Sequence, residues 1–269
     1  MAATRVAAHR GGAALWPENS LYAFRRALAL GVAFVELDVH LARDGGMVVI
    51  HDRTLDRTTE GTGPVGDRTT EALSRLRLRD PAGALTEERV PMLDDVLALL
   101  IPSSVSLLLE VKGPGQSVYY ERVDARLHPI GGPRYEGLEE RVLERIRVSG
   151  MSERATVMAF NPDVITRVRA LAPATRTTLL VGRSHLDGPG ASVEEALDVA
   201  QALGVTDVGL EHALVDASVV TATHRRGLVL GVWTVDDGAE IRRYADLGID
   251  IVTTDRPDLA LVTLCGRRA

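Results

Sequence analysis

Short apolar runs alternate along the chain with segments whose apolar residues recur at helical spacing. Many of the short runs are apolar at nearly every position, which is typical of strands covered by helices on both faces. Strands are predicted at Arg5–Ala8, Ala33–Asp38, Met47–Ile50, Val105–Val111, Ala155–Ala159, Arg176–Val181, Asp207–Leu210, Leu228–Trp233 and Ile249–Thr253. Helices are predicted at Ser20–Ala29, Leu93–Leu99, Gly137–Ser149, Pro162–Ala170, Ser192–Ala202, Asp216–Arg225, Gly238–Asp246 and Pro257–Leu264.

The order of these elements predicts the fold class. If Met47–Ile50 is counted as a short extra ribbon, eight strands alternate with helices. This order is typical of an α/β fold of the (β/α)8 TIM barrel type, and an open doubly wound sheet is the alternative. No Gly-x-Gly-x-x-Gly follows the first strand, which disfavours the dinucleotide-binding form of that alternative. We therefore predict one barrel domain over residues 1–269.

Two stretches interrupt the alternation. Residues 53–91 are rich in Thr, Asp, Arg and Gly, and we predict that they form a small insertion after the second strand. Gly113–Glu136 holds several glycines and prolines and is predicted to be a long loop. Long loops on one face of a barrel often shape the substrate pocket.

Composition and charge narrow the possible partners. The 269 residues are 45% apolar and 25% charged with a net charge of −6, so nucleic acid is not an expected partner. Cys265 is the only cysteine, which excludes a disulfide within the chain and agrees with a reducing compartment. No apolar run of about 18 residues predicts a membrane span. No export signal precedes the first strand, so we expect a cytoplasmic protein; the sequence gives no indication of oligomeric state.

Polar residues gather where the predicted strands end. Active sites of barrels lie at the carboxyl ends of the strands, so side chains from distant parts of the chain should meet there. The residues at these positions are His9, Arg10, Glu36, Asp38, His51, Asp52, Glu110, Lys112, Trp233, Thr254 and Asp255.

Three of these residues suggest a metal site. Glu36 and Asp38 lie two positions apart on one strand, so both side chains face the same side, and Glu110 ends the neighbouring strand. Three carboxylates that share one pocket repel each other, and a hard cation such as Mg2+ or Ca2+ would relieve the repulsion. The alternative is a salt-bridge network with Arg10 and Lys112.

The remaining residues suggest acid–base chemistry and anion binding. His9 and His51 can act as general base and general acid near neutral pH; the alternative for each is a structural histidine. Arg10 and Lys112 are suited to hold phosphate oxygens, a role compatible with pairing to the carboxylates. Trp233 could pack against a substrate or belong to the core.

Two neighbouring residues leave their roles open. Asn19 either caps the helix that follows it or binds polar groups of the site. His40 shares a face with Asp38 and is a weak candidate for a supporting role.

Several short motifs occur together in a fixed order. They are His9-Arg10-Gly11, Pro17-Glu18-Asn19-Ser20, Glu36-Leu37-Asp38-Val39, Val49-Ile50-His51-Asp52, Leu55-Asp56-Arg57-Thr58-Thr59, Val90-Pro91-Met92-Leu93-Asp94-Asp95-Val96-Leu97, Leu109-Glu110-Val111-Lys112, Trp233-Thr234-Val235 and Thr254-Asp255-Arg256-Pro257. Each motif is short, but the order and spacing together are specific. The chain resembles the glycerophosphodiester phosphodiesterases of the bacterial type nearly end to end.

This resemblance implies a function and a role for each site residue. The family's fold is a barrel with a small insertion after the second strand, and its reaction yields glycerol 3-phosphate and an alcohol. The implied function is therefore metal-dependent hydrolysis of small glycerophosphodiesters. The implied roles are metal ligands for Glu36, Asp38 and Glu110, general acid and base for His9 and His51, and phosphate binding for Arg10 and Lys112.

Two alternatives remain. A related barrel phosphodiesterase would act on lysophospholipids or phosphoinositides and would favour an exposed apolar rim, for which Tyr119 and Tyr120 are candidates. A non-catalytic phosphate-binding module on the same barrel is the second alternative, because a fold does not by itself confer a function.

Overall fold

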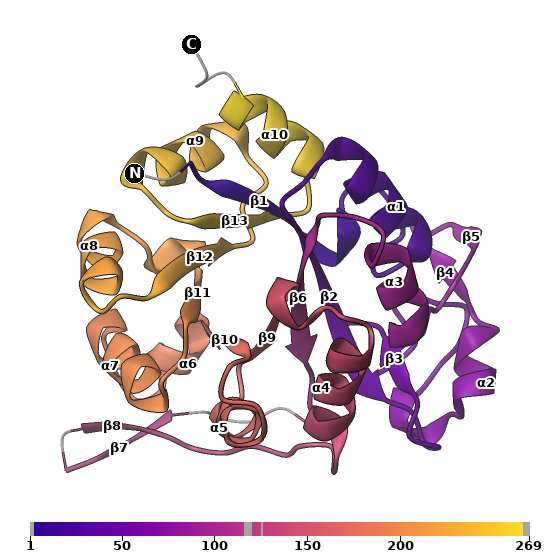
Figure 1. Ribbon diagram of the computed structural model, residues 1–269, viewed down its shortest axis with the longest axis horizontal. Helices are drawn as coiled ribbons and strands as arrows, with labels where there is room; N and C mark the ends of the chain where they lie inside the picture. The colour runs from indigo at the N-terminus through magenta and orange to yellow at the C-terminus, as the bar shows by residue number, and fades with distance from the viewer. Residues whose placement is uncertain (1–2, 116–119, 125, 266–269) are drawn as a thin grey trace.

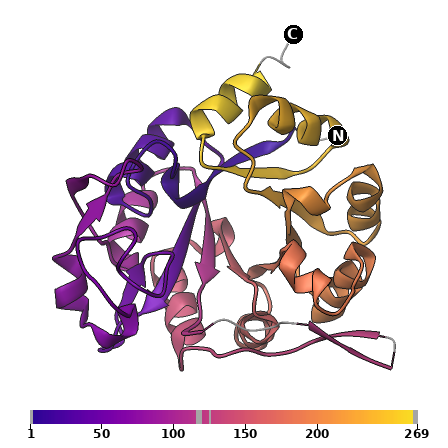
Figure 2. The ribbon, with the colours of Figure 1, turned by 180° about the vertical axis from the view of Figure 1, so that it is seen from behind.

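Eight parallel strands close into a barrel in the computed structural model, which describes residues 3–115, 120–124 and 126–265 (Figure 1, and from behind in Figure 2). The barrel strands are β1 (Arg5–Ala8), β2 (Phe34–Leu41), β6 (Ser106–Val111), β9 (Ala155–Ala159), β10 (Arg176–Val181), β11 (Asp207–Glu211), β12 (Val229–Trp233) and β13 (Ile251–Thr254). Closure occurs at β1, which pairs with β2 on one side and with β13 on the other. The predicted (β/α)8 barrel is confirmed.

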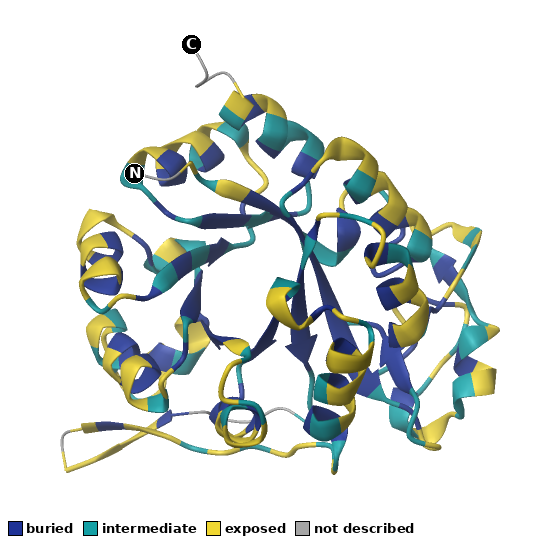
Figure 3. Ribbon diagram, viewed as in Figure 1, coloured by how far each residue is buried: buried dark blue, intermediate teal, exposed yellow. Residues whose placement is uncertain are grey.

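A ring of helices covers the outside of the barrel. Their inward faces are buried and their outward faces exposed, as Figure 3 shows. The ring consists of α1 (Leu21–Leu30), α3 (Leu93–Leu100), α4 (Leu138–Val148), α5 (Pro162–Leu171), α7 (Val193–Leu203), α8 (Ala217–Arg225), α9 (Gly238–Leu247) and α10 (Pro257–Cys265). The sequence predicted each of these helices to within a residue at either end. A short helix, α6 (Arg183–Asp187), follows β10 and was not predicted.

Local signals explain where these helices begin and end. The Oγ of Ser20 accepts a hydrogen bond from the backbone N–H of Ala23, which satisfies one free donor at the start of α1. Asn161 caps α5, and Pro162 occupies its first turn, where a missing N–H has no consequence. Gly248 ends α9 with φ 92°, a left-handed conformation that glycine adopts without strain.

The insertion after β2 is more structured than the sequence predicted. The insertion contains α2 (Thr70–Ser74) and the hairpin of β4 (Arg77–Arg79) and β5 (Leu85–Arg89). It follows β3 (Met47–Val49), the predicted short ribbon, which runs antiparallel to β2. It lies against one side of the barrel in Figure 1. A separate apolar cluster holds it together, formed by Ala42, Val48, Ile50, Leu55, Val65, Leu73, Leu78 and Val90.

The predicted long loop after β6 contains a hairpin of β7 (Tyr120–Val123) and β8 (Arg126–Pro129). The guanidinium of Arg122 holds it to α7, with Nη1 2.8 Å from Oε1 of Glu195. Tyr120 is 1% exposed, so it forms no apolar rim for a lipid. Tyr119, the other candidate for that rim, lies outside the described residues. Within the described residues, no helix has the length and apolar character needed to cross a membrane.

Candidate active site

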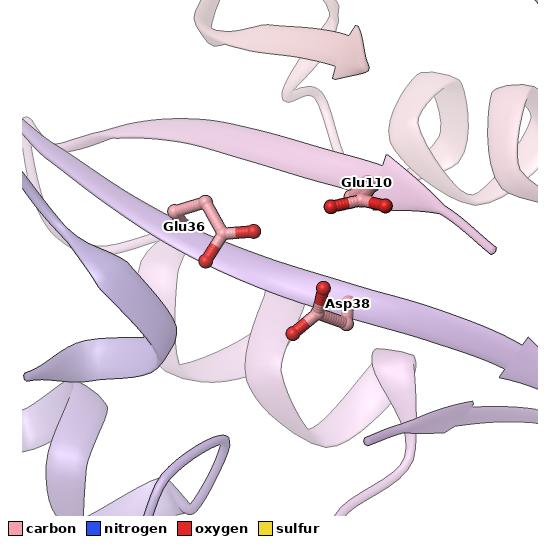
Figure 4. Close-up of side chains that lie close together, drawn as sticks. All are labelled: Glu36, Asp38 and Glu110. Atoms are coloured by element: carbon pink, nitrogen blue, oxygen red, sulfur yellow. The ribbon is translucent and has the colours of Figure 1, made fainter. Parts of the chain in front are cut away.

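Three carboxylates meet at the carboxyl ends of two adjacent strands. Glu36 and Asp38 come from β2, and the register of the parallel pair places Asp38 beside Glu110 of β6. Figure 4 shows the three side chains turned toward one another. One oxygen of each lies within 4.8 Å of the others, and all three residues are buried. The period-2 alternation predicted this shared face, and strand pairing brings in Glu110.

Two basic residues lie within this acidic cluster. The Nζ of Lys112 is 2.9 Å from Oδ1 of Asp38 and 2.6 Å from Oε1 of Glu110. The Nε of Arg10 is 3.4 Å from Oδ2 of Asp38, and its backbone N–H donates to Oε2 of Glu36. The salt-bridge network that the sequence offered as an alternative is therefore present. It leaves three carboxylates opposite two cations, so one negative charge is not matched inside the cluster.

The pKa values of the carboxyl groups reflect this imbalance. Burial raises the pKa of Glu36 to about 8, and the charge of Asp38 adds to the rise. Burial would also raise the pKa of Asp38, but the positive charges of Lys112, His51 and Arg10 together outweigh it and hold that pKa well below its usual range. Glu36 is therefore the carboxyl group of the cluster that holds a proton at neutral pH when no metal is bound. A divalent cation with oxygen ligands fits this donor set, because it would match the excess charge and favour the ionised form of Glu36.

The loop after β1 contributes a hydrogen bond to the carboxylate cluster. The Nδ2 of Asn19 donates a hydrogen bond to Oδ2 of Asp38 at 2.8 Å, whereas Ser20 caps α1. The structure thereby decides between the two roles that the sequence left open for Asn19. Gly11 turns the chain with φ 82°, and a Cβ at this position would lie 2.7 Å from the Cβ of Ala23. Only glycine allows this loop to pack so closely on α1.

His9 has a carboxylate partner that the sequence analysis did not identify. Its Nδ1 lies 2.7 Å from Oδ1 of Asp255, which follows β13. Burial would lower the pKa of His9, but the hydrogen bond to Asp255 and the charge of Glu36 outweigh this and raise it. Oδ1 of Asp236 accepts hydrogen bonds from the backbone N–H of Asp255 and from the hydroxyl of Thr254. These bonds hold the backbone of Asp255 in place beside His9. The position of Asp255 at the end of a predicted strand was the signal in the sequence that could have indicated this pairing.

His51 belongs to a second network of charged groups. Its Nδ1 lies 2.7 Å from Oδ1 of Asp52. The guanidinium of Arg57 binds Asp52 through Nε at 2.7 Å and through Nη2 at 3.0 Å. The same guanidinium binds Glu18 through Nη1 at 2.7 Å and Nη2 at 2.8 Å, and Glu18 accepts a further bond from Arg10. Arg57 therefore joins the His51 loop to the Arg10 loop, a role that the sequence did not predict.

His40 lies behind His51. Its Nε2 is 3.0 Å from the carbonyl oxygen of His51, and its Nδ1 is 3.0 Å from the hydroxyl of Tyr135. Burial lowers the pKa of His40 to about 4, so the ring is neutral at physiological pH. His40 contacts the backbone of His51, and its supporting role stays a prediction.

A cavity of about 140 Å3 extends from the carboxylates into the barrel interior. Its upper part is bordered by His9, His51 and the aromatic pair of Phe160 and Trp233, whose rings meet edge to face at 5.5 Å. Trp233 therefore lines the pocket, which is one of the two positions that the sequence allowed for it. The apolar wall further inside is formed by Leu108, Met158, Leu180 and Ile251.

A wider groove of about 690 Å3 leads outward from the same centre. It shares His51, Glu110 and Phe160 with the cavity, so the two spaces meet at the predicted catalytic groups. Six of the predicted site residues line the cavity: His9, Arg10, Glu36, His51, Glu110 and Trp233. Lys112 lines the groove, and Asp38 forms an ion pair with Lys112.

Comparison with known proteins identifies the family. Residues 9–259 match the model of the glycerophosphoryl diester phosphodiesterase family. The chain belongs to this family. A glycerophosphodiester phosphodiesterase of Caldanaerobacter subterraneus is 30% identical over 256 residues, 95% of each chain. Another from Bacillus altitudinis is 32% identical over 263 residues, 96% of this chain and 97% of the relative. The prediction that the chain is a phosphodiesterase enzyme is confirmed.

A solved structure supports the fold of this glycerophosphoryl diester phosphodiesterase family member. The phosphodiesterase of Oleispira antarctica, in complex with the product sn-glycerol-3-phosphate, superimposes with a TM-score of 0.80. The match covers 98% of this chain and 97% of the other at 22% sequence identity. At this identity the likeness concerns the barrel itself.

Proposed function

We propose that the chain is a single-domain enzyme that hydrolyses glycerophosphodiesters to glycerol 3-phosphate and an alcohol with the help of a divalent metal. The observation that carries this proposal is the convergence of three carboxylates, two cations and two histidines at the mouth of one cavity. The sn-glycerol-3-phosphate bound as product in the Oleispira antarctica phosphodiesterase supports the same reaction. The cytoplasmic location expected from the sequence stays a prediction.

Glu36, Asp38 and Glu110 would hold Mg2+ or Ca2+. When bound there, the metal would polarise the phosphate and screen its charge. Arg10 and Lys112 lie against the same carboxylates, so their remaining N–H groups can hold non-bridging phosphate oxygens. The phosphate would therefore bind at the junction of the cavity and the groove.

His9 and His51 would move the protons. One takes the proton of the attacking oxygen, from water or from a glycerol hydroxyl, and the other protonates the departing alkoxide. Each ring has one nitrogen bound to a carboxylate, Asp255 for His9 and Asp52 for His51. That bond orients the ring and leaves Nε2 for the substrate.

The size of the cavity favours a small glycerol end over an acylated one. A cavity of about 150 Å3 accommodates benzene, and the interior cavity here measures about 140 Å3. A three-carbon glycerol fits this space beside Trp233, whereas a long acyl chain exceeds it. This observation favours simple glycerophosphodiesters over lysophospholipids.

The test is release of glycerol 3-phosphate from glycerophosphocholine and glycerophosphoglycerol with Mg2+, Ca2+ or excess chelator. We expect metal-dependent release that disappears in His9→Ala and His51→Ala. Cleavage of lysophospholipids alone would favour the lipid-directed alternative. Binding of the metal with no cleavage of any diester would favour the phosphate-binding module.

A further inference from the structure

The outer groove has the position and size of a site for the departing alcohol. It shares His51 and Glu110 with the cavity but is otherwise lined mainly by loop residues, and its volume of about 690 Å3 is several times that of the cavity. If the phosphate binds at the junction and the glycerol end fills the cavity, the alcohol must lie in the groove. The side chains of the groove then determine which alcohol is accepted.

One basic side chain in the lining of this groove, Arg53, has no ion-pair partner among the described residues. Among the described residues that line it, the carboxylates are Asp52 and Glu110. Asp52 is bound by His51 and Arg57, and Glu110 is bound by Lys112. Arg53 also lines the groove and is exposed, and within the described part of the chain it makes no ion pair. A positively charged alcohol would meet Arg53, whereas each carboxylate of the lining already has a cationic partner.

Uncharged hydrogen-bonding groups complete the lining. Thr54 of the insertion and Ser184 of α6 line the groove, and their hydroxyls make no hydrogen bond to the protein within residues 3–115, 120–124 and 126–265. Among the described lining residues, Phe160 is the only phenylalanine, tyrosine or tryptophan. A quaternary ammonium group is typically held by several aromatic rings, so this lining suits hydroxyl groups better.

We propose that the groove selects an uncharged polyhydroxyl alcohol over a cationic one, and that Arg53 is a specificity-determining residue. This inference rests on the function proposed above and names the class of its departing group. Arg53 acts by repelling a cationic headgroup and by donating hydrogen bonds to hydroxyl oxygens. Thr54 and Ser184 supply further donors and acceptors.

The experiment compares kcat/KM for glycerophosphoglycerol and glycerophosphocholine, which differ in the charge of the alcohol. The variants are Arg53→Ala and Arg53→Glu, with Arg25→Glu as a control of equal charge change on the exposed face of α1, outside both pockets. The wild type should prefer glycerophosphoglycerol. Arg53→Glu should shift the ratio toward glycerophosphocholine by roughly 3- to 10-fold, Arg53→Ala by less, and added salt should reduce the shift. Arg25→Glu should leave the ratio unchanged.

The outcomes separate this inference from the proposed function. Cleavage of both substrates, with equal ratios in wild type and the two Arg53 variants, would overturn the role of Arg53 and leave the hydrolysis standing. A wild-type preference for glycerophosphocholine would overturn the selection for polyols. Absence of cleavage of either substrate with both metals would overturn the proposed function and this inference with it.

Discussion

Nδ1 of His9 lies 2.7 Å from Oδ1 of Asp255, although 246 positions separate the two residues. They meet because β1 and β13 pair where the barrel closes, with Ala8 in register with Thr254. The carboxylate raises the pKa of the histidine and fixes the orientation of its ring. Closure of the barrel therefore positions the proposed catalytic histidine beside its carboxylate partner.

Replacing the carboxylate should change the pH dependence of activity. Asp255→Asn keeps the shape of the side chain and removes its charge, so the pKa of His9 should fall. Whether His9 acts as base or acid, the limb of the pH–rate profile that it controls should then move to lower pH. The measurement is kcat/KM across pH 5–9 for both proteins. Unchanged limbs in an active variant would exclude His9 from the titrating pair.

Arg57 should support catalysis through the two loops that it joins. Arg57→Lys keeps the charge but cannot bind Asp52 and Glu18 with paired hydrogen bonds, so kcat should fall by roughly 10-fold. Because the side chain is half exposed, the free energy of unfolding should fall by only about 1 kcal/mol. Arg77→Lys is the matched control, since Arg77 pairs with Glu60 away from the site. It should leave kcat unchanged; full activity in Arg57→Lys would contradict the bridging role.

The carboxylates should respond differently to neutralisation. Without metal, Glu36→Gln should leave the free energy of unfolding unchanged or raise it, because glutamine can be buried beside Asp38 without taking up the proton that Glu36 needs. Asp38→Asn should lower it by about 3 kcal/mol, because Lys112 and Arg10 lose a buried partner.

A divalent metal should stabilise the wild type against unfolding but should not stabilise these two variants. Thermal unfolding with Mg2+, Ca2+ or chelator should show stabilisation of the wild type by the metal. Both variants should lose that stabilisation. A wild type whose melting temperature does not respond to either metal at millimolar concentration would contradict the metal site.

Two glycines of the barrel interior allow a test of the cavity. A Cβ at Gly231 would meet Val208 O at 3.7 Å and the Cβ of Ile251 at 3.9 Å, so Gly231→Ala fits and takes space from the cavity. It should raise KM for glycerophosphodiesters by roughly 10-fold with little change in stability. At Gly209 the Cβ would lie 2.6 Å from Leu180 Cδ2, so Gly209→Ala should destabilise the fold by about 1–3 kcal/mol. An unchanged KM in Gly231→Ala would mean that the substrate does not enter the cavity.

The sequence by itself determined the elements whose signals are local. Uniformly apolar runs marked the barrel strands, and capping residues such as Ser20 and Asn161 marked helix starts, because these preferences act within a few residues. The alternation along β2 also placed Glu36 and Asp38 on one face. The small elements between residues 53 and 136 were missed, since β5 alternates between exposed and half-buried residues and no continuous apolar run distinguishes it from a loop.

The tertiary structure alone decided which side chains become partners. Local sequence could not show that Asp255 would orient His9, that Arg57 would join Asp52 to Glu18, or that Asn19 would bind Asp38. Each of these contacts requires barrel closure or the docking of a loop, and these depend on the packing of the whole chain. The burial of the site residues also depends on the whole fold. Removal of Glu36 from water raises its pKa to about 8, and only the assembled barrel excludes that water.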